Sequence, residues 1–397
     1  MDPLKNPFSP GAGNPPPELA GRDELLETAR IMLGRIKNGR YEQSLMLVGL
    51  RGVGKTVLLN RIRELAETQG YGTVMVEATE SRSLPELMIP ALRQVLIKLD
   101  TMENVSSKVK LGLRVLRSFV GALKVKVRDV ELGLDIDPQK GTADSGDLET
   151  DLAELFAALG EAAQDRKTAV AIIVDEIQYL SEAEMSALIM AIHRVSQRRL
   201  PLVLVGAGLP QLVGLAGRSK SYAERLFQYP MVGPLSKTDA MAALRDPVKK
   251  EGAAITEDAL KEIVNLTQGY PYFLQEWGYQ AWNLAGKSPI DKSVVAHATA
   301  AAIKKLDQSF FRVRFDRLTP REKDYIRALA DLGPGAHRSG DVADRLGVKV
   351  QSSAPLRSGL IRKGMIYSPA HGDTAFTVPL FDAFMLRTMP IWKKSKS

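Results

Sequence analysis

Short apolar runs alternate with amphipathic segments between residues 19 and 234. The amphipathic segments have helical periodicity and lie around 22–37, 57–69, 85–99 and 181–198. The apolar runs occupy 44–50, 73–79, 168–176 and 200–208. The run at 168–176 is nearly continuous, which is typical of a parallel strand covered on both faces. This order predicts a doubly wound α/β domain over 19–234. Residues 1–18, rich in Pro, Gly and Asn, are expected to form an extended leader.

Residues 101–143 interrupt this rhythm and predict an insertion. Apolar residues between 111 and 120 lie at helical spacing beside basic ones, so a helix is expected there. The alternation over 123–136 changes phase at Arg128-Asp129, which predicts a hairpin with a two-residue turn. We expect the helix to pack on its own domain, with a membrane or a partner as the alternative. Another helix should begin near 144, with Ser145 or Asp147 as its N-cap.

The remaining chain predicts an α-helical lid over 235–310 and a winged helix-turn-helix domain over 311–390. Helices are expected at Lys237–Glu251, Thr256–Thr267 and Pro271–Ala285. Three more follow at 319–333, 339–347 and 352–364, with Pro355 in the first turn of the last. Two strands at 365–369 and 374–378 would then form the wing, before a closing helix at 380–388 and a basic tail over 391–397.

One motif predicts nucleotide binding. The segment from Gly49 to Thr56 matches G-x-x-x-x-G-K-[ST] in full, between an expected strand and an expected helix. Glycines let backbone N–H groups surround phosphate oxygens, Lys55 would reach the β- and γ-phosphates of ATP, and Thr56 would hold Mg²⁺. The expected nucleotide-binding residues here are Gly49, Arg51, Gly52, Val53, Gly54, Lys55, Thr56 and Val57.

Two acidic residues end the apolar run at 168–176. Asp175 and Glu176 would lie at the carboxyl edge of a parallel sheet, where ligands bind. Asp175 would orient Mg²⁺ or its water, and Glu176 would activate the attacking water. Because this pair follows a full phosphate loop, the two motifs together predict an ATPase.

With these two motifs the chain resembles the AAA+ ATPases, most closely the branch that holds origin-recognition initiators and STAND signalling ATPases. Leu19-Ala20-Gly21-Arg22-Asp23 resembles the "GRE" box of that group, which implies that Arg22 lies beside the adenine. Gly269-Tyr270-Pro271 resembles the lid element that contacts the nucleotide, which adds Gly269 and Pro271 to the implied binding residues. The resemblance covers nearly the whole chain.

The chain departs from the AAA+ pattern at two places that affect hydrolysis. The strand after the acidic pair runs into Val205-Gly206-Ala207-Gly208, with no polar sensor side chain. The lid has Gly-x-Pro where many members keep a sensor arginine. Both absences predict slow turnover. Arg225 is a candidate arginine finger that would act across a subunit boundary in a homo-oligomer, and a surface arginine paired with Glu224 or another acid is the alternative. Arg218 is a weaker candidate.

The net charge is distributed unevenly. Residues 311–397 hold 16 basic and 8 acidic residues, whereas the first 310 hold 38 of each, so the whole excess of +8 lies at the C-terminal end. This favours double-stranded DNA as the partner of the winged helix, and a basic tail on a neutral fold is the alternative. The third helix of the winged helix would face the major groove. Its candidate DNA-contacting residues are Lys349, Gln351, Ser352, Ser353, Arg357, Arg362 and Lys363.

Composition excludes several other classes. The chain has no cysteine and only four scattered histidines, so disulfide frameworks, thiolate nucleophiles and Cys- or His-rich metal sites are excluded. It has no apolar run of about 18 residues and no secretory signal, so a cytoplasmic protein is expected. The sequence therefore predicts an ATP- and Mg²⁺-dependent switch that controls DNA binding. A signalling or scaffold ATPase with protein partners, and a nucleotide-binding protein with negligible turnover, are the alternatives.

Overall fold

The computed structural model describes residues 1–11, 13–100, 106–123 and 136–392, which cluster into two compact units. The sheet unit contains Arg22–Gly49 and Lys55–Val232. The helical unit contains Met1–Gly21, Leu50–Gly54 and the chain from Gly233 onward. The phosphate-loop segment Leu50–Gly54 thus groups with the helical unit, although the residues on either side of it belong to the sheet unit.

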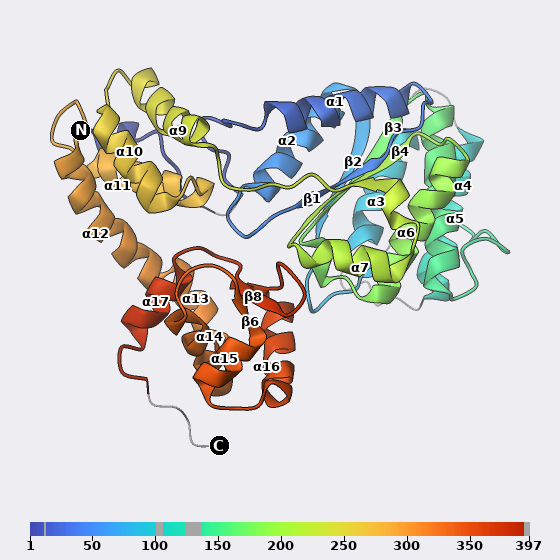
Figure 1. The fold of residues 1–397 in the computed structure, drawn as a ribbon. Helices are drawn as coiled ribbons and strands as arrows, with labels where there is room; N and C mark the ends of the chain where they lie inside the picture. The colour runs from blue at the N-terminus through green and yellow to red at the C-terminus, as the bar shows by residue number, and fades with distance from the viewer. Residues whose placement is uncertain (12, 101–105, 124–135, 393–397) are drawn as a thin grey trace. The chain divides into compact units, whose positions relative to one another are not determined.

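Five parallel strands form the centre of the sheet unit, in the order β2-β3-β4-β1-β5 (Figure 1). They are β1 (Ser44–Val48), β2 (Tyr71–Glu77), β3 (Ala169–Asp175), β4 (Leu202–Gly208) and β5 (Phe227–Gln228). Every residue of β1, β3 and β4 is buried, as the continuous apolar runs predict. The doubly wound α/β fold is therefore confirmed. The last strand of this sheet lies at 227–228, beyond the four apolar runs, and Met231 forms an isolated bridge to Val48.

Helices cover both faces of this sheet (Figure 1). Met46, Ile172 and Leu204 share one core cluster with residues of α3 to α7, while strand residues of the opposite parity are buried on the other face. The helices are α1 (Asp23–Lys37), α2 (Lys55–Thr68), α3 (Leu84–Asp100), α4 (Ser107–Ala122), α5 (Leu148–Asp165), α6 (Glu182–Gln197), α7 (Gln211–Ser219) and α8 (Ala223–Leu226).

The predicted insertion begins with a helix that packs on its own unit. Ser106 caps α4, and Val109, Val115 and Phe119 are buried in the core shared with α3 and α5. The expected packing on its own domain is therefore confirmed for α4. The predicted hairpin lies almost wholly in 124–135, outside the described residues. Helix α5 follows with Asp147 as its N-cap, one of the two candidates.

The first part of the helical unit contains α9 (Lys237–Lys250), α10 (Glu257–Thr267), α11 (Pro271–Leu284), α12 (Lys292–Gln308) and α13 (Phe310–Asp316). The N-terminal leader packs along α11. Asn6 Nδ2 donates to Asn283 Oδ1 over 2.8 Å, and Phe8 is buried. A Cβ at Gly278 would lie 2.7 Å from the Phe8 ring, so glycine in the middle of α11 allows this close approach.

The C-terminal segment has the three helices and the hairpin that the sequence predicts, plus one short extra strand. Its elements are α14 (Pro320–Asp331), β6 (His337–Arg338), α15 (Ser339–Leu346), α16 (Val350–Arg362), β7 (Ile366–Tyr367), β8 (Asp373–Phe376) and α17 (Phe381–Thr388). The strands pair antiparallel in the order β6-β8-β7. Because α16 begins at Val350, two residues earlier than predicted, Pro355 lies beyond the first turn.

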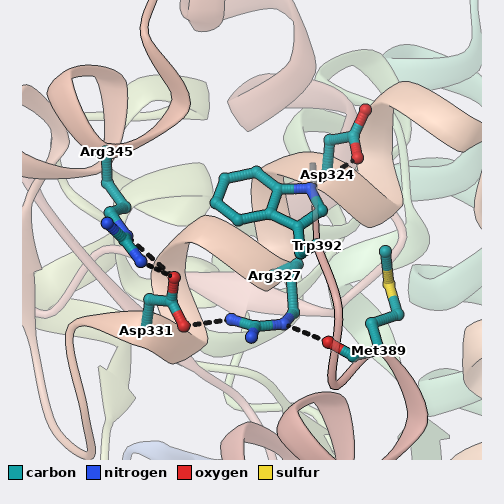
Figure 2. A network of polar contacts seen from close by, with 6 residues as sticks. All are labelled: Asp324, Arg327, Asp331, Arg345, Met389 and Trp392. Carbon is teal, nitrogen blue, oxygen red and sulfur yellow. Dashed lines mark hydrogen bonds and ion pairs between the residues drawn. The ribbon is translucent and has the colours of Figure 1, made fainter. Parts of the chain in front are cut away.

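A polar network joins α14, α15 and the chain after α17, as Figure 2 shows. The buried Arg327 Nε donates to the carbonyl of Met389 over 2.9 Å, and its guanidinium also contacts Asp331. Arg345 Nε donates to the other oxygen of Asp331 over 2.8 Å. Trp392 Nε1 donates to Asp324, and its ring lies within 6 Å of both guanidinium groups. These contacts fix the chain that follows α17 on the surface of the segment.

Candidate ATP site and candidate DNA interface

The phosphate loop follows β1 and leads directly into α2. Gly52 (φ 83°) and Gly54 (φ 94°) have left-handed backbone conformations that favour glycine, which explains two of the three glycines in the segment from Gly49 to Thr56. Lys55 is only 6% exposed, and its Nζ donates to the carbonyl of Gly49 over 2.9 Å. Its ammonium group therefore lies against the backbone at the start of the loop, where the motif requires a cation for phosphate.

Thr56 and Asp175 are brought together from α2 and the end of β3. Thr56 Oγ1 donates to Asp175 Oδ2 over 2.6 Å, and the Glu176 N–H donates to Asp175 Oδ1 over 2.8 Å. Burial raises the pKa of Asp175, although the hydrogen bond from Thr56 opposes this effect. A hydroxyl and a carboxylate are the hard oxygen ligands that Mg²⁺ prefers, so this pair fits the metal that the motif implies.

Glu176 lies at the turn that follows β3. It has a left-handed backbone conformation (φ 50°), which is uncommon outside glycine and costs free energy in a fold. Gln178, in the short 3-10 helix Ile177–Tyr179, donates from Nε2 to the Glu176 carboxylate. The sequence motif did not identify Gln178, because nothing in the spacing indicates that its side chain turns back to Glu176.

Two tyrosines at the start of α11 hold the phosphate-loop segment of the helical unit. The Tyr270 hydroxyl donates to the carbonyl of Arg51, and the Tyr272 N–H donates to the carbonyl of Gly52 over 3.2 Å. A Cβ at Gly52 would lie 3.1 Å from the Tyr270 ring and 3.2 Å from Tyr272 Cβ. The loop is thus in contact with this end of α11, and sequence reasoning singled out neither tyrosine.

The predicted lid motif supplies the backbone for these contacts. Gly269 has a φ of 68°, and a Cβ there would lie 2.5 Å from the carbonyl oxygen of Leu235. Leu235 N–H donates to the Gly269 carbonyl over 2.9 Å. Pro271 occupies the first position of α11, where its missing N–H is not needed. Both residues therefore place the two tyrosines, and whether they touch a nucleotide themselves stays a prediction.

The other predicted nucleotide-site residues lie near helix ends or in the phosphate loop. Arg22 is the half-buried N-cap of α1, Val57 is in the first turn of α2, and Val53 is buried within the loop. Arg225 is exposed in α8, and its carbonyl accepts from Tyr41 and Gln43. Within the described ranges, the Arg225 guanidinium has no ion-pair partner. The weaker candidate, Arg218, pairs with Glu182 over 3.0 Å.

Four of the seven predicted DNA-contacting residues are exposed on α16. Lys349 is the N-cap, and Gln351 and Ser352 lie in the first turn. Arg362 is exposed in the last turn. These four side chains are therefore available to a ligand at both ends of the helix.

The other three are engaged within the segment. Ser353 is 2% exposed, and its hydroxyl donates to the carbonyl of Val350. Arg357 donates to Thr374 Oγ1, Ser368 Oγ and the Asp373 carbonyl over 2.9, 2.8 and 2.7 Å, so it ties α16 to the hairpin. Lys363 pairs with Glu322 over 2.7 Å. Burial of Ser353 and the hydrogen bonds of Arg357 and Lys363 make these three less available to DNA than the other four.

The chain is similar to several known proteins. An AAA ATPase domain model matches residues 18–205, and a domain family of unknown function matches residues 308–385. An uncharacterized HTH-type transcriptional regulator of Methanocaldococcus jannaschii is 25% identical over 94% of this chain and 89% of its own length.

Two solved structures match the chain along most of its length. The Walker-type ATPase of Pyrococcus abyssi superposes with a TM-score of 0.55 at 16% identity, over 92% of this chain and 96% of that one. The Cdc6 protein of Pyrobaculum aerophilum has a TM-score of 0.49 at 16% identity, over 98% of each chain. No helix among the described residues has the length and apolar character to span a bilayer. Residues 18–205 form an AAA ATPase domain, as the two nucleotide-binding motifs predict.

Proposed function

We propose that the protein is an ATP-hydrolysing switch whose nucleotide state controls DNA binding by a C-terminal winged helix. One observation carries the proposal. The phosphate-loop segment Leu50–Gly54 is hydrogen-bonded to Tyr270 and Tyr272, and Tyr272 stacks on Phe310, whose ring centroid is 4.5 Å away. Phe310 begins the helix that precedes the C-terminal segment. A phosphate bound by the loop would therefore act on the two tyrosines, one of which contacts the helix that leads into the C-terminal segment.

The residues of the ATP site have separate roles in this proposal. Lys55 neutralises phosphate charge, and Thr56 and Asp175 hold Mg²⁺, which when bound offsets the negative charge of the phosphates. Glu176 accepts a proton from the attacking water. Arg225 stabilises the phosphoryl group bound by a neighbouring copy of the chain. Its guanidinium is exposed and has no ion-pair partner among the described residues, which supports this role.

Turnover is proposed to be slow. Strand β4 ends at Gly208 without a polar side chain that could contact the γ-phosphate. The start of α11 has Gly269-Tyr270-Pro271 in place of an arginine. A switch benefits from slow hydrolysis, because each nucleotide state must persist long enough to change binding of the second ligand.

Three observations support DNA as that second ligand. Helix α16 presents Lys349, Gln351, Ser352 and Arg362 to solvent, and side chains of these types contact phosphates and base edges. The positive excess of the chain lies in the same region. A relative that aligns over most of the chain is named an HTH-type transcriptional regulator. In this proposal the β7-β8 hairpin is the wing, which Arg357 fixes to α16.

The first prediction concerns DNA affinity, measured by fluorescence anisotropy with a labelled duplex at several salt concentrations. We expect affinity to fall steeply with salt and to differ between ATP, ADP and no nucleotide. The double variant Lys349→Ala, Arg362→Ala should bind more weakly and reduce the slope of log K against log salt by about 2. Arg321→Ala is the matched control, because it removes an exposed cation from α14 and should change neither value much.

Two outcomes would reject this proposal. One is no binding at physiological salt in any nucleotide state, and the other is equal loss of affinity in the α16 double variant and in Arg321→Ala. Either result would instead favour the C-terminal segment as a docking surface for a protein partner, and a pull-down comparing the ATP and ADP states would follow.

A further inference from the structure

The end of β4 has no polar side chain of its own, but the side chain of Gln178, from another part of the sheet unit, contacts the backbone there. Gln178 reaches this point from the short 3-10 helix after β3. The N–H of Leu209, directly after β4, donates to Gln178 Oε1 over 3.0 Å. At its other end the same amide donates from Nε2 to the carboxylate of Glu176. One side chain therefore bridges the end of β4 and the proposed general base.

The glycine at the end of β4 is explained by this bridge. A Cβ at Gly208 would lie 2.7 Å from Gln178 Oε1, closer than Cβ atoms approach a neighbour. The next nearest atoms, Ile177 Cγ2 and Leu212 Cδ2, would be 3.1 and 3.2 Å away and would need to move only slightly. Gly208 does not have a left-handed φ, so its backbone alone does not require glycine. The space taken by the Gln178 amide accounts for it.

The bridge continues to the start of the phosphate loop. Gly49 N–H donates to the carbonyl of Gly208 over 3.1 Å, and the Gly49 carbonyl accepts from Lys55 Nζ over 2.9 Å. Hydrogen bonds thus connect Lys55, Gly49, the end of β4, Gln178 and Glu176 in one series. Each member between Lys55 and Glu176 has a partner on both sides, so a displacement at one end of the series would shift the groups at the other.

We propose that Gln178 is a positioning residue for ATP hydrolysis, which holds the Glu176 carboxylate through its amide and is itself held by the backbone at the end of β4. The inference rests on the proposed ATPase activity. An amide suits this task because it is uncharged and can donate to Glu176 while it accepts from Leu209. It restrains one carboxylate oxygen of Glu176 and leaves the other to accept a proton from water.

The second prediction is that Gln178→Met lowers kcat for ATP about 10-fold or more and changes the dissociation constant of ATP less than twofold. Methionine has a similar shape but cannot hold the carboxylate, and misplacement of a reacting group by about 1 Å is enough for losses of this size. Gly208→Ala should give the same pattern, because its methyl group displaces the amide without altering Gln178 itself. Gln197→Met, at an exposed site on α6, is the matched control and should keep the wild-type kcat.

A double-mutant cycle separates positioning from a general packing role. If Gln178 acts through Glu176, then Gln178→Met should reduce the residual rate of Glu176→Gln by less than twofold. Gln178→Met combined with Gly208→Ala should likewise be no slower than either single variant. Equal losses in the presence and absence of the Glu176 carboxylate, or an unchanged kcat in Gln178→Met, would overturn the proposal.

Hydrogen exchange provides a test that does not depend on turnover. In nucleotide-free protein, the Leu209 amide should exchange faster in Gln178→Met and Gly208→Ala than in wild type, because its acceptor is removed. If wild type and Lys55→Ala hydrolyse ATP equally slowly, the proposed ATPase activity fails, whereas the exchange result still judges the bridge. An unchanged Leu209 exchange rate in both variants would show that the bridge does not form in solution.

Discussion

At the residue scale, the third prediction concerns the pH dependence of Mg²⁺ binding at Asp175. Protons and Mg²⁺ compete for this carboxylate, and burial raises its pKa. As pH falls, Asp175 is therefore protonated at a higher pH than an exposed aspartate, whose pKa is about 4. We expect the gain in ATP affinity that Mg²⁺ provides to decline as pH falls, and this decline to begin above the pH at which exposed aspartates are protonated.

Titration calorimetry of ATP with and without Mg²⁺, from neutral pH down to about pH 4, is the measurement. Asp175→Asn should show little Mg²⁺-dependent gain at any pH, because an amide is a weaker ligand and does not titrate. Thr56→Val is the companion variant, since it removes the second proposed ligand and the hydrogen bond that opposes the raised pKa. A Mg²⁺ effect in wild type that stays constant down to about pH 4 would contradict the expectation.

Residue-scale features differ in how far the sequence could predict them. The roles of Lys55, Thr56 and Asp175 depend on neighbours within one motif or on strand ends that meet at one sheet edge, and the structure brings Thr56 and Asp175 into contact. The contacts of Gln178 and Tyr272 depend on rotamers and on which loops approach each other. Spacing along the chain carries no information on these, and the same is true of the three α16 candidates that are engaged internally.

At the element scale, the fourth prediction concerns the network in Figure 2. Burial alone would raise the pKa of Asp331, but hydrogen bonds from Arg327 and Arg345 outweigh burial and hold it below the usual range. Asp331→Asn leaves the buried Arg327 without its carboxylate, so it should reduce the free energy of unfolding by about 2–4 kcal/mol at pH 7. Asp316→Asn, which breaks an exposed pair with Arg312, is the control and should change it by less than about 0.5 kcal/mol.

The pH dependence of this effect has a defined sign. A carboxyl whose pKa is lowered by folding stabilises the native state above its unfolded pKa of about 4 and loses that contribution as pH falls through the lowered value. The difference between wild type and Asp331→Asn should therefore be greatest near neutral pH and shrink in acid. Urea unfolding followed by circular dichroism measures it. A difference that is absent at pH 7, or that grows below pH 4, would argue against a stabilising role for the carboxylate.

Elements were predictable where periodicity was long and uninterrupted. The buried strands β1, β3 and β4 and the capped helices α5 and α10 lie where apolar runs and capping residues indicate. Prediction was weakest for short elements. Strand β5 has two residues, and its position is set by pairing with β1 rather than by its own composition. The sequence predicts Pro355 in the first turn of a helix that begins at 352. Helix α16 begins instead at Val350, directly after the turn that follows the C-cap Gly347 of α15.

At the scale of the whole molecule, the proposed switch requires a physical connection from the nucleotide to the DNA-binding surface. Within the helical unit, aromatic rings form such a connection. Tyr272, whose N–H contacts Gly52, stacks on Phe310, and the Arg314 guanidinium lies 3.9 Å from the Phe310 ring centroid. Phe310 packs against Phe311, which in turn contacts two phenylalanines of α17 in the C-terminal segment, Phe381 and Phe384.

The fifth prediction is that Phe310→Ala separates ATP binding from DNA binding. Phe310 is neither in the phosphate loop nor on α16, so the variant should keep its ATP affinity and its DNA affinity without nucleotide within about twofold. The ratio of DNA affinities in the ATP and ADP states should fall toward 1, because the ring that links Tyr272 to Phe311 is removed. Val313→Ala, at an exposed site on the same helix, should retain the wild-type ratio. If the ratio persists in Phe310→Ala while both affinities are normal, the nucleotide signal does not pass through these rings.

By reciprocity, DNA should also raise the affinity for the favoured nucleotide in wild type and lose that effect in Phe310→Ala. Agreement between the two directions would establish the aromatic connection as the coupling element of the switch.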